Sequence, residues 1–102
     1  MTEQQIQTKL IQRLEADGYY TIKLMKTNKN GIPDLLAIPK NSDVLFIEVK
    51  RPGKNPTPLQ IFRIKELIKH GIKSIVCRSP EEYSDTKVDN REKDRPDDIH
   101  PF

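Results

Sequence analysis

The sequence predicts a single small α/β domain with the element order αβββαβ, in which a mixed four-stranded sheet is flanked by helices. Two segments have apolar residues at helical spacing, and each begins with a capping-box pattern and ends at a glycine. Four short runs rich in β-branched and aromatic residues are typical of strands. The second helical segment separates the third run from the fourth, so these two strands should lie parallel, joined by a right-handed crossover.

The first helix is expected over residues 3–16. Thr2 and Gln5 have the spacing of a capping box, and Gly18 provides a stop signal. Four apolar residues recur at helical spacing: Ile6, Leu10, Ile11 and Leu14. This pattern predicts one apolar helix face that packs against the sheet.

The strands are expected at four runs of the chain: residues 19–25, 34–38, 44–50 and 73–79. The first three can form an antiparallel meander. A basic, turn-rich loop at 26–31 separates the first two, and a five-residue turn at 39–43 separates the second from the third.

The second helix should begin after a Pro- and Gly-rich loop. Thr57 is a plausible N-cap, Pro58 suits the first helical position, and Gln60 completes a second capping box. An apolar stripe follows: Leu59, Ile61, Phe62, Ile64, Leu67 and Ile68. Gly71 ends the helix.

The net charge of +3 hides an uneven distribution. Residues 1–80 carry 14 Lys and Arg against 7 Asp and Glu, whereas residues 81–102 carry 4 against 8. We therefore expect a basic folded domain over 1–80, whose surface either contacts a polyanion or is merely solvated. The tail at 81–102 should be disordered, or fold only on a partner.

No apolar run approaches the roughly 20 residues that a membrane-spanning helix needs, and the N-terminus has no signal-like apolar stretch. The single cysteine, Cys77, excludes an internal disulfide and suits a reducing compartment. We expect a cytoplasmic protein in which Cys77 is a small buried side chain.

The hairpin formed by the second and third predicted strands brings three charged residues together. With the five-residue turn at 39–43, Asp34 lies directly opposite Glu48, and directly opposed residues point to the same face. Lys50 is two residues beyond Glu48, so it points to that face as well. A slip of one residue would place the two carboxylates on opposite faces.

Two opposed carboxylates about 5 Å apart repel each other by roughly 3 kcal/mol at an effective dielectric of 20. Lys50 can offset this repulsion in a purely structural ion network. Alternatively, a divalent cation lies between Asp34 and Glu48, with the backbone carbonyl of Val49 as a further ligand. Hard oxygen ligands suit Mg²⁺ or Mn²⁺, and the lack of a His and Cys cluster argues against zinc. Such a site, with Lys50 alongside, is typical of phosphodiester hydrolysis.

Two short motifs, "GIPD" (31–34) and "IEVK" (47–50), resemble the PD-(D/E)xK nuclease superfamily. The longer run "GIPDLLAI … FIEVKRPGKNPTPLQ" resembles the VRR-NUC family of phage, bacterial and repair nucleases. This resemblance implies a restriction-endonuclease-like core. It also implies that Asp34 and Glu48 bind Mg²⁺ or Mn²⁺ and that Lys50 is catalytic.

The same resemblance implies site roles for an acidic residue early in the first helix, here Glu3 as a metal ligand, and for Gln60. Each residue also has a structural explanation. A negative charge in the first turn, as at Glu3, favours the helix dipole. Gln60 is already accounted for by the capping box.

Four basic residues on loops next to the site motifs are expected to contact DNA phosphates: Lys26, Lys29, Arg51 and Lys54, with Lys40 as a fifth candidate. Such contacts fix the position of DNA without reading its sequence. The small size of the domain suggests a homodimer, because a two-fold assembly presents two sites to a branched junction. We therefore expect an Mg²⁺-dependent endonuclease for branched DNA such as Holliday junctions.

Several alternatives share these features. The domain can be a DNA-binding module that does not cleave, or a non-specific or nicking nuclease of a phage or restriction system. It can also be an interaction protein in which Lys50 simply neutralises the carboxylate pair.

Overall fold

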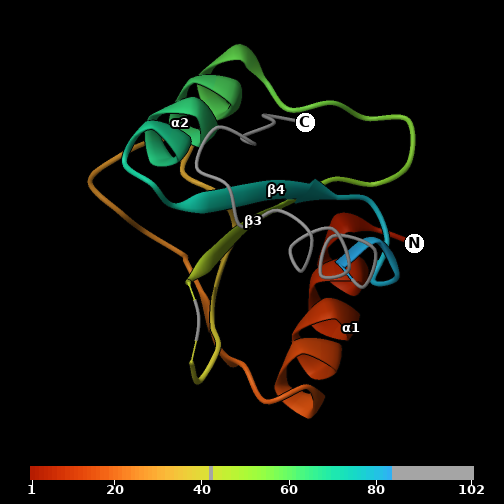
Figure 1. The fold of residues 1–102 in the computed structure, drawn as a ribbon. Coiled ribbons are helices and arrows are strands. Elements are labelled where there is room, and N and C mark those ends of the chain that lie inside the picture. The colour runs from red at the N-terminus through yellow and green to blue at the C-terminus, as the bar shows by residue number, and fades with distance from the viewer. Residues whose placement is uncertain (42, 84–102) are drawn as a thin grey trace.

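The computed structural model describes residues 1–41 and 43–83 (Figure 1). These residues form six elements, in the predicted order: α1 (Glu3–Ala16), β1 (Tyr20–Lys23), β2 (Leu35–Ile38), β3 (Leu45–Val49), α2 (Pro58–Lys69) and β4 (Lys73–Cys77). The four strands form one sheet in the order β1-β2-β3-β4. The first three are antiparallel and β3 pairs with β4 in parallel, which confirms the predicted mixed sheet.

The β2–β3 hairpin has the predicted register. Leu36 pairs with Phe46, and their neighbours continue the same alignment. Strand β1 is shorter than expected and ends at Lys23. The reason lies in β2: Leu24 still donates its N–H to the carbonyl of Asp34 (2.8 Å), but the residue before Asp34 is Pro33, which has no N–H to continue the ladder.

Both helices begin with the predicted capping boxes. Thr2 Oγ1 accepts the N–H of Gln5 and Gln5 Oε1 accepts the N–H of Thr2; Thr57 and Gln60 repeat the arrangement at the start of α2. These reciprocal bonds satisfy backbone donors that a helix start leaves unpaired. They also fix which residues occupy the first turn of each helix.

The main core lies between α1 and one face of the sheet. From α1 it includes Ile6, Leu10 and Leu14, and from the strands it includes Leu35, Ala37, Leu45, Ile47, Val49 and Cys77. The two helices lie on either side of β3 and β4 (Figure 1). Cys77 is buried, as predicted, and its thiol pKa is raised by burial to about 12.

Helix α2 buries less of its apolar stripe than the periodicity suggested. Ile64 is fully buried, but Leu59 and Phe62 are 44% and 52% exposed. The apolar spacing therefore identified the helix correctly, but the sheet does not cover its first turns. The helix packs mainly on β4, and Leu59 lies instead against Gly31 in the loop before β2.

The folded unit continues past residue 80. Tyr83, which the sequence assigned to the tail, is fully buried, and its hydroxyl donates to Asp17 Oδ2 at 3.1 Å. Its ring makes an edge-to-face contact with Tyr19, with ring centroids 5.5 Å apart. This contact anchors the chain after β4 to the end of α1. The rest of the predicted tail, 84–102, lies outside the described residues.

Within residues 1–41 and 43–83, no helix combines the length and the apolar character needed to span a membrane.

Candidate active site

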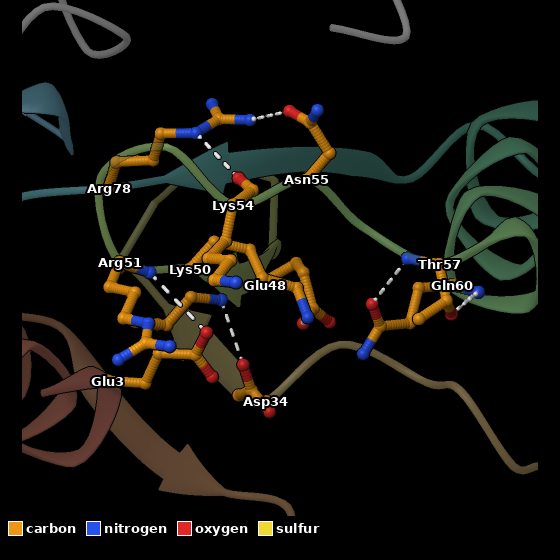
Figure 2. A network of polar contacts seen from close by, with 11 residues as sticks. Glu3, Asp34, Glu48, Lys50, Arg51, Lys54, Asn55, Thr57, Gln60 and Arg78 are labelled. Carbon is orange, nitrogen blue, oxygen red and sulfur yellow. Dashed lines mark hydrogen bonds and ion pairs between the residues drawn. The ribbon is translucent and has the colours of Figure 1, made fainter.

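Asp34 and Glu48 lie opposite each other at one end of the hairpin, where the confirmed register places them. Asp34 directly precedes β2 and is half-buried, whereas Glu48 lies within β3 and is only 1% exposed. Asp34 Oδ2 accepts the backbone N–H of Val49 at 2.8 Å, which holds its carboxyl group against β3. In Figure 2 the two carboxyl groups point into the same space, together with the side chain of Lys50.

Lys50 directly follows β3 at the edge where the parallel strands β3 and β4 both end. Its backbone N–H donates to the carbonyl of Cys77 at 3.0 Å, so its direction is fixed by the sheet. Its Nζ lies 3.8 Å from Glu48 Oε2, an ion pair too long for a direct hydrogen bond. The ammonium of Lys50 therefore offsets part of the negative charge of the pair but does not form a hydrogen bond with Glu48.

Both acids are held in surroundings that disfavour their charged forms. Burial, followed by the nearby charge of Asp34, raises the pKa of Glu48 from 4.5 to about 8, although Lys50 opposes the change. Burial also raises the pKa of Asp34, and the hydrogen bond from Val49 offsets part of this effect. At neutral pH the pair therefore retains a proton, with the Glu48 carboxyl donating to the Asp34 carboxylate.

One atom of this pair is left without a partner. Glu48 Oε1 is buried and receives no hydrogen bond from any described residue. A buried carboxyl oxygen without a hydrogen-bond partner is costly, because it has lost its hydration. A cation at this position would supply the missing interaction.

The donor set fits a hard, partly hydrated cation. No group of three or more His, Cys, Asp and Glu side chains is placed to hold a metal in the described part of the chain. Two carboxylates, with the remaining positions taken by water and substrate phosphate, match the usual way in which Mg²⁺ is bound. The same set suits Mn²⁺ and is unsuitable for zinc.

Glu3 lies beside this pair rather than within it. The charge of Glu3 is near enough to raise the pKa of both Asp34 and Glu48. Its Oε2 accepts the N–H of Arg51 over a long 3.4 Å. Helix α1 thus brings Glu3 to the rim of the site, where the capping box orients the first turn (Figure 2).

Gln60 approaches from the other side, on the first turn of α2 (Figure 2). Its Oε1 accepts the N–H of Thr57 at 2.8 Å, so the capping box uses the oxygen of this side chain. The amide nitrogen is the part of Gln60 that the cap does not use. Gln60 can therefore offer the site an N–H donor, but its oxygen is already used by the cap and is not available to bind a metal.

Comparisons with known proteins identify the family to which the chain belongs. The family model of the VRR-NUC domain matches residues 1–81. The chain belongs to the VRR-NUC family. It is 31% identical over 77 residues to a protein named "Putative nuclease p44" from Acyrthosiphon pisum secondary endosymbiont phage 1, and the match covers 76% of this chain and 83% of that protein.

Two solved structures resemble the VRR-NUC chain described here. One, described as a VRR_NUC domain, has a TM-score of 0.76 at 28% identity, covering 86% of this chain and 97% of its own. The other, a VRR_NUC domain protein, has a TM-score of 0.73 at 21% identity, covering 87% of each chain, and shows the shared fold. The predicted restriction-endonuclease-like α/β fold and the family are therefore confirmed, and the domain is a nuclease domain.

The basic residues predicted to bind DNA are distributed unevenly around the VRR-NUC site. Arg51 and Lys54 lie on the loop that follows Lys50 and border an open hollow of about 330 Å³. Thr2, Glu3, Lys50 and Asn55 complete its lining. Lys26 and Lys29 are exposed on the loop that leads to Asp34.

Lys40 is not part of this arrangement. It follows β2, at the opposite end of the hairpin from Asp34. Six residues of extended chain separate these two positions by about 20 Å. The structure therefore does not bring Lys40 to the site of the VRR-NUC domain.

Sequence reasoning missed one residue that contacts the site loop, Arg78. It directly follows β4, and its side chain donates to the loop between β3 and α2. A signal was available: β3 and β4 were expected to be parallel, so the residues after both strands had to lie at the same edge of the sheet.

Proposed function

We propose that this VRR-NUC domain is an Mg²⁺-dependent endonuclease that hydrolyses phosphodiester bonds in DNA, with Mn²⁺ as a substitute. The observation that carries the proposal is the opposed pair of Asp34 and Glu48, with a buried, unpartnered oxygen on Glu48 and the ammonium of Lys50 beside it. Carboxylates that retain a proton in the absence of metal are favourable ligands for a cation, which replaces that proton.

Each residue has a distinct role in this proposal. Asp34 and Glu48 hold the cation, and the carbonyl of Val49 is a further ligand. Lys50 orients the attacking water or stabilises the negative charge that develops on the phosphate. Glu3 acts through a water molecule at the rim, and Gln60 donates an amide N–H to a phosphate oxygen.

The bound cation supplies an activated water and offsets the charge on the phosphate oxygens. The chain contributes the rest: a dry position for Glu48, a fixed direction for Asp34, and a cationic loop beside them. Arg51, Lys54, Lys26 and Lys29 bind phosphates on either side of the cleaved bond.

We also propose that the domain acts as a homodimer on branched DNA such as four-way junctions. Exposed apolar side chains support an interface between copies: Tyr20 and Ile22 on the edge strand β1, and Phe62 on α2. A two-fold dimer presents two sites in matching orientation to a junction. The phage protein that the chain resembles supports a bacterial or phage-infected cytoplasm as the place of action.

The test is cleavage of labelled linear, flapped and four-way DNA in Mg²⁺, Mn²⁺ or EDTA. Asp34→Asn should abolish cleavage and leave DNA binding intact. Asp43→Asn, the same chemical change at an exposed position before β3, is the matched control and should cleave normally. Equal cutting of linear and four-way DNA, with light scattering that finds only monomers, would contradict the junction-specific homodimer.

A second candidate is a DNA-binding module that does not cleave. It is favoured by one observation, that the ammonium of Lys50 lies 3.8 Å from Glu48 Oε2 and offsets part of the charge of the pair without a metal. The two candidates differ in whether Asp34→Ala abolishes cleavage while it leaves DNA binding intact, because the module does not cleave DNA at all.

A further inference from the structure

Arg78 directs its side chain onto the loop between β3 and α2, which we call the 51–56 loop. Its Nε donates to the carbonyl of Lys54 at 3.0 Å, and its Nη2 donates to Asn55 Oδ1 at 2.9 Å (Figure 2). Its own backbone N–H donates to Glu82 Oε1 at 2.7 Å, which secures the position from which the guanidinium extends. The planar guanidinium thus holds two successive loop residues from one direction.

The 51–56 loop has few other contacts that fix its shape. Its residues are largely exposed, and Gly53 has a φ of +84°. Within the loop, Lys54 donates its N–H to the carbonyl of Arg51 at 3.1 Å. At its start, the bond from Arg51 to Glu3 is long. A loop with so little buried surface depends on its hydrogen bonds for a defined conformation.

The same loop carries two cations next to the proposed catalytic site. Arg51 and Lys54 border the hollow next to Lys50, on the side of the site where Glu3 also lies. A long cationic side chain loses conformational freedom when it binds a phosphate, and this loss is smaller if its backbone is already fixed. A fixed backbone at Lys54 therefore lowers the entropic cost of binding a phosphate.

We propose that Arg78 is a positioning residue, which fixes the 51–56 loop so that Lys54 and Arg51 hold a DNA phosphate beside the Asp34 and Glu48 pair. The inference rests on the proposed function, because it takes DNA as the ligand of the loop. Arg78 acts through the loop and not as a phosphate ligand. Two of its nitrogens are engaged by Lys54 and Asn55, and its role depends on that fork geometry rather than on its charge.

The experiment measures the affinity of the full chain for a labelled four-way DNA by fluorescence anisotropy in EDTA, where no cleavage occurs. Arg78→Ala should weaken binding about tenfold, the effect of one ordered group of contacts. Arg78→Lys should weaken it nearly as much, because an ammonium keeps the charge but not the fork. Arg13→Ala removes the same charge from an exposed site on α1 and is the matched control.

A double-mutant cycle tests whether Arg78 acts through Lys54. Lys54→Ala keeps the carbonyl that Arg78 binds but removes the cation. The double variant should therefore bind only slightly more weakly than Lys54→Ala alone, by the part of the effect that acts through Arg51, and the two losses should be clearly less than additive. Asn55→Ala removes one contact of Arg78 without changing the arginine, and should cause a smaller loss in the same direction. It also keeps the test available if Arg78→Ala fails to fold.

Kinetics under cleaving conditions give a further check. Arg78→Ala should raise KM with little change in kcat, whereas a fraction of unfolded protein would lower the apparent kcat alone. Normal binding by Arg78→Lys, strict additivity with Lys54→Ala, or a loss no larger than that of Arg13→Ala would each overturn the inference. If the wild-type chain binds DNA but does not cut it, the proposed activity fails while the role of Arg78 is still decided by binding. If it does not bind DNA, both fail.

Discussion

Replacing Glu48 by glutamine should make the metal-free protein more stable at neutral pH while it abolishes cleavage. The substitution keeps the shape of the side chain and removes its charge. The amide nitrogen that it introduces can donate to the Asp34 carboxylate, as the protonated Glu48 does in the wild-type chain. Glu48 can therefore be made neutral without loss of packing, whereas truncation of its side chain would leave a cavity beside β3.

The size of the effect follows from the pKa of Glu48, which folding raises from 4.5 to about 8. Between these pH values the folded protein holds a proton that the unfolded chain releases. The stability contributed by this group is therefore complete below pH 4.5 and is lost as the pH rises through about 8. At pH 7 the loss is about 3 kcal/mol, from 1.36 kcal/mol per pH unit.

The assay is urea unfolding in EDTA at pH 5, 7 and 8.5. The stability of the wild-type protein should fall over this range, and that of Glu48→Gln should change much less. Mn²⁺ should then stabilise the wild-type protein and not the variant. Glu15→Gln, the same change at an exposed position of α1, is the control. A wild-type stability that is constant or rises with pH, or a Glu48→Gln protein less stable than wild type at pH 7, would refute the reasoning.

Three further predictions concern other parts of the chain. Gly31→Ala should lower the free energy of unfolding, measured in urea, by about 1–3 kcal/mol. The φ of +83° is strained for alanine, and the added Cβ would lie 2.7 Å from Cγ of Leu59. Gly53→Ala, with a similar φ but open space, should cost less. Tyr83→Phe removes one buried hydrogen bond and should lower stability by about 1 kcal/mol, without changing DNA cleavage. Lys54→Ala should weaken DNA binding and reduce its salt dependence by about one phosphate contact, whereas Lys40→Ala should change neither.

The part of the site that depends on local rules could be predicted from the sequence. The length of the 39–43 turn and the alternation of the strands fixed the hairpin register, which the structure confirms. That register alone brings Asp34 opposite Glu48. The capping boxes at Thr2 and Thr57 were equally local, because each depends on residues only three positions apart.

The remaining features depend on how distant elements pack. The periodicity of α2 identified its apolar residues but not which of them the sheet covers, and Phe62 is 52% exposed. Tyr83 follows two glutamates, so composition assigned it to the tail, although its aromatic contact with Tyr19, just after α1, places it in the core. The bonds from Arg78 to the 51–56 loop join residues more than twenty positions apart, and no local pattern encodes them.

The hydrogen bond from Val49 to Asp34 has a consequence for how this hairpin tolerates change. Adding or deleting one residue between Ile38 and Leu45 would turn Glu48 towards α1 and deprive Asp34 of its backbone donor in the same step. Point substitutions in that turn leave both intact. In natural and engineered variants, this connection should therefore tolerate changes of amino acid but not changes of length.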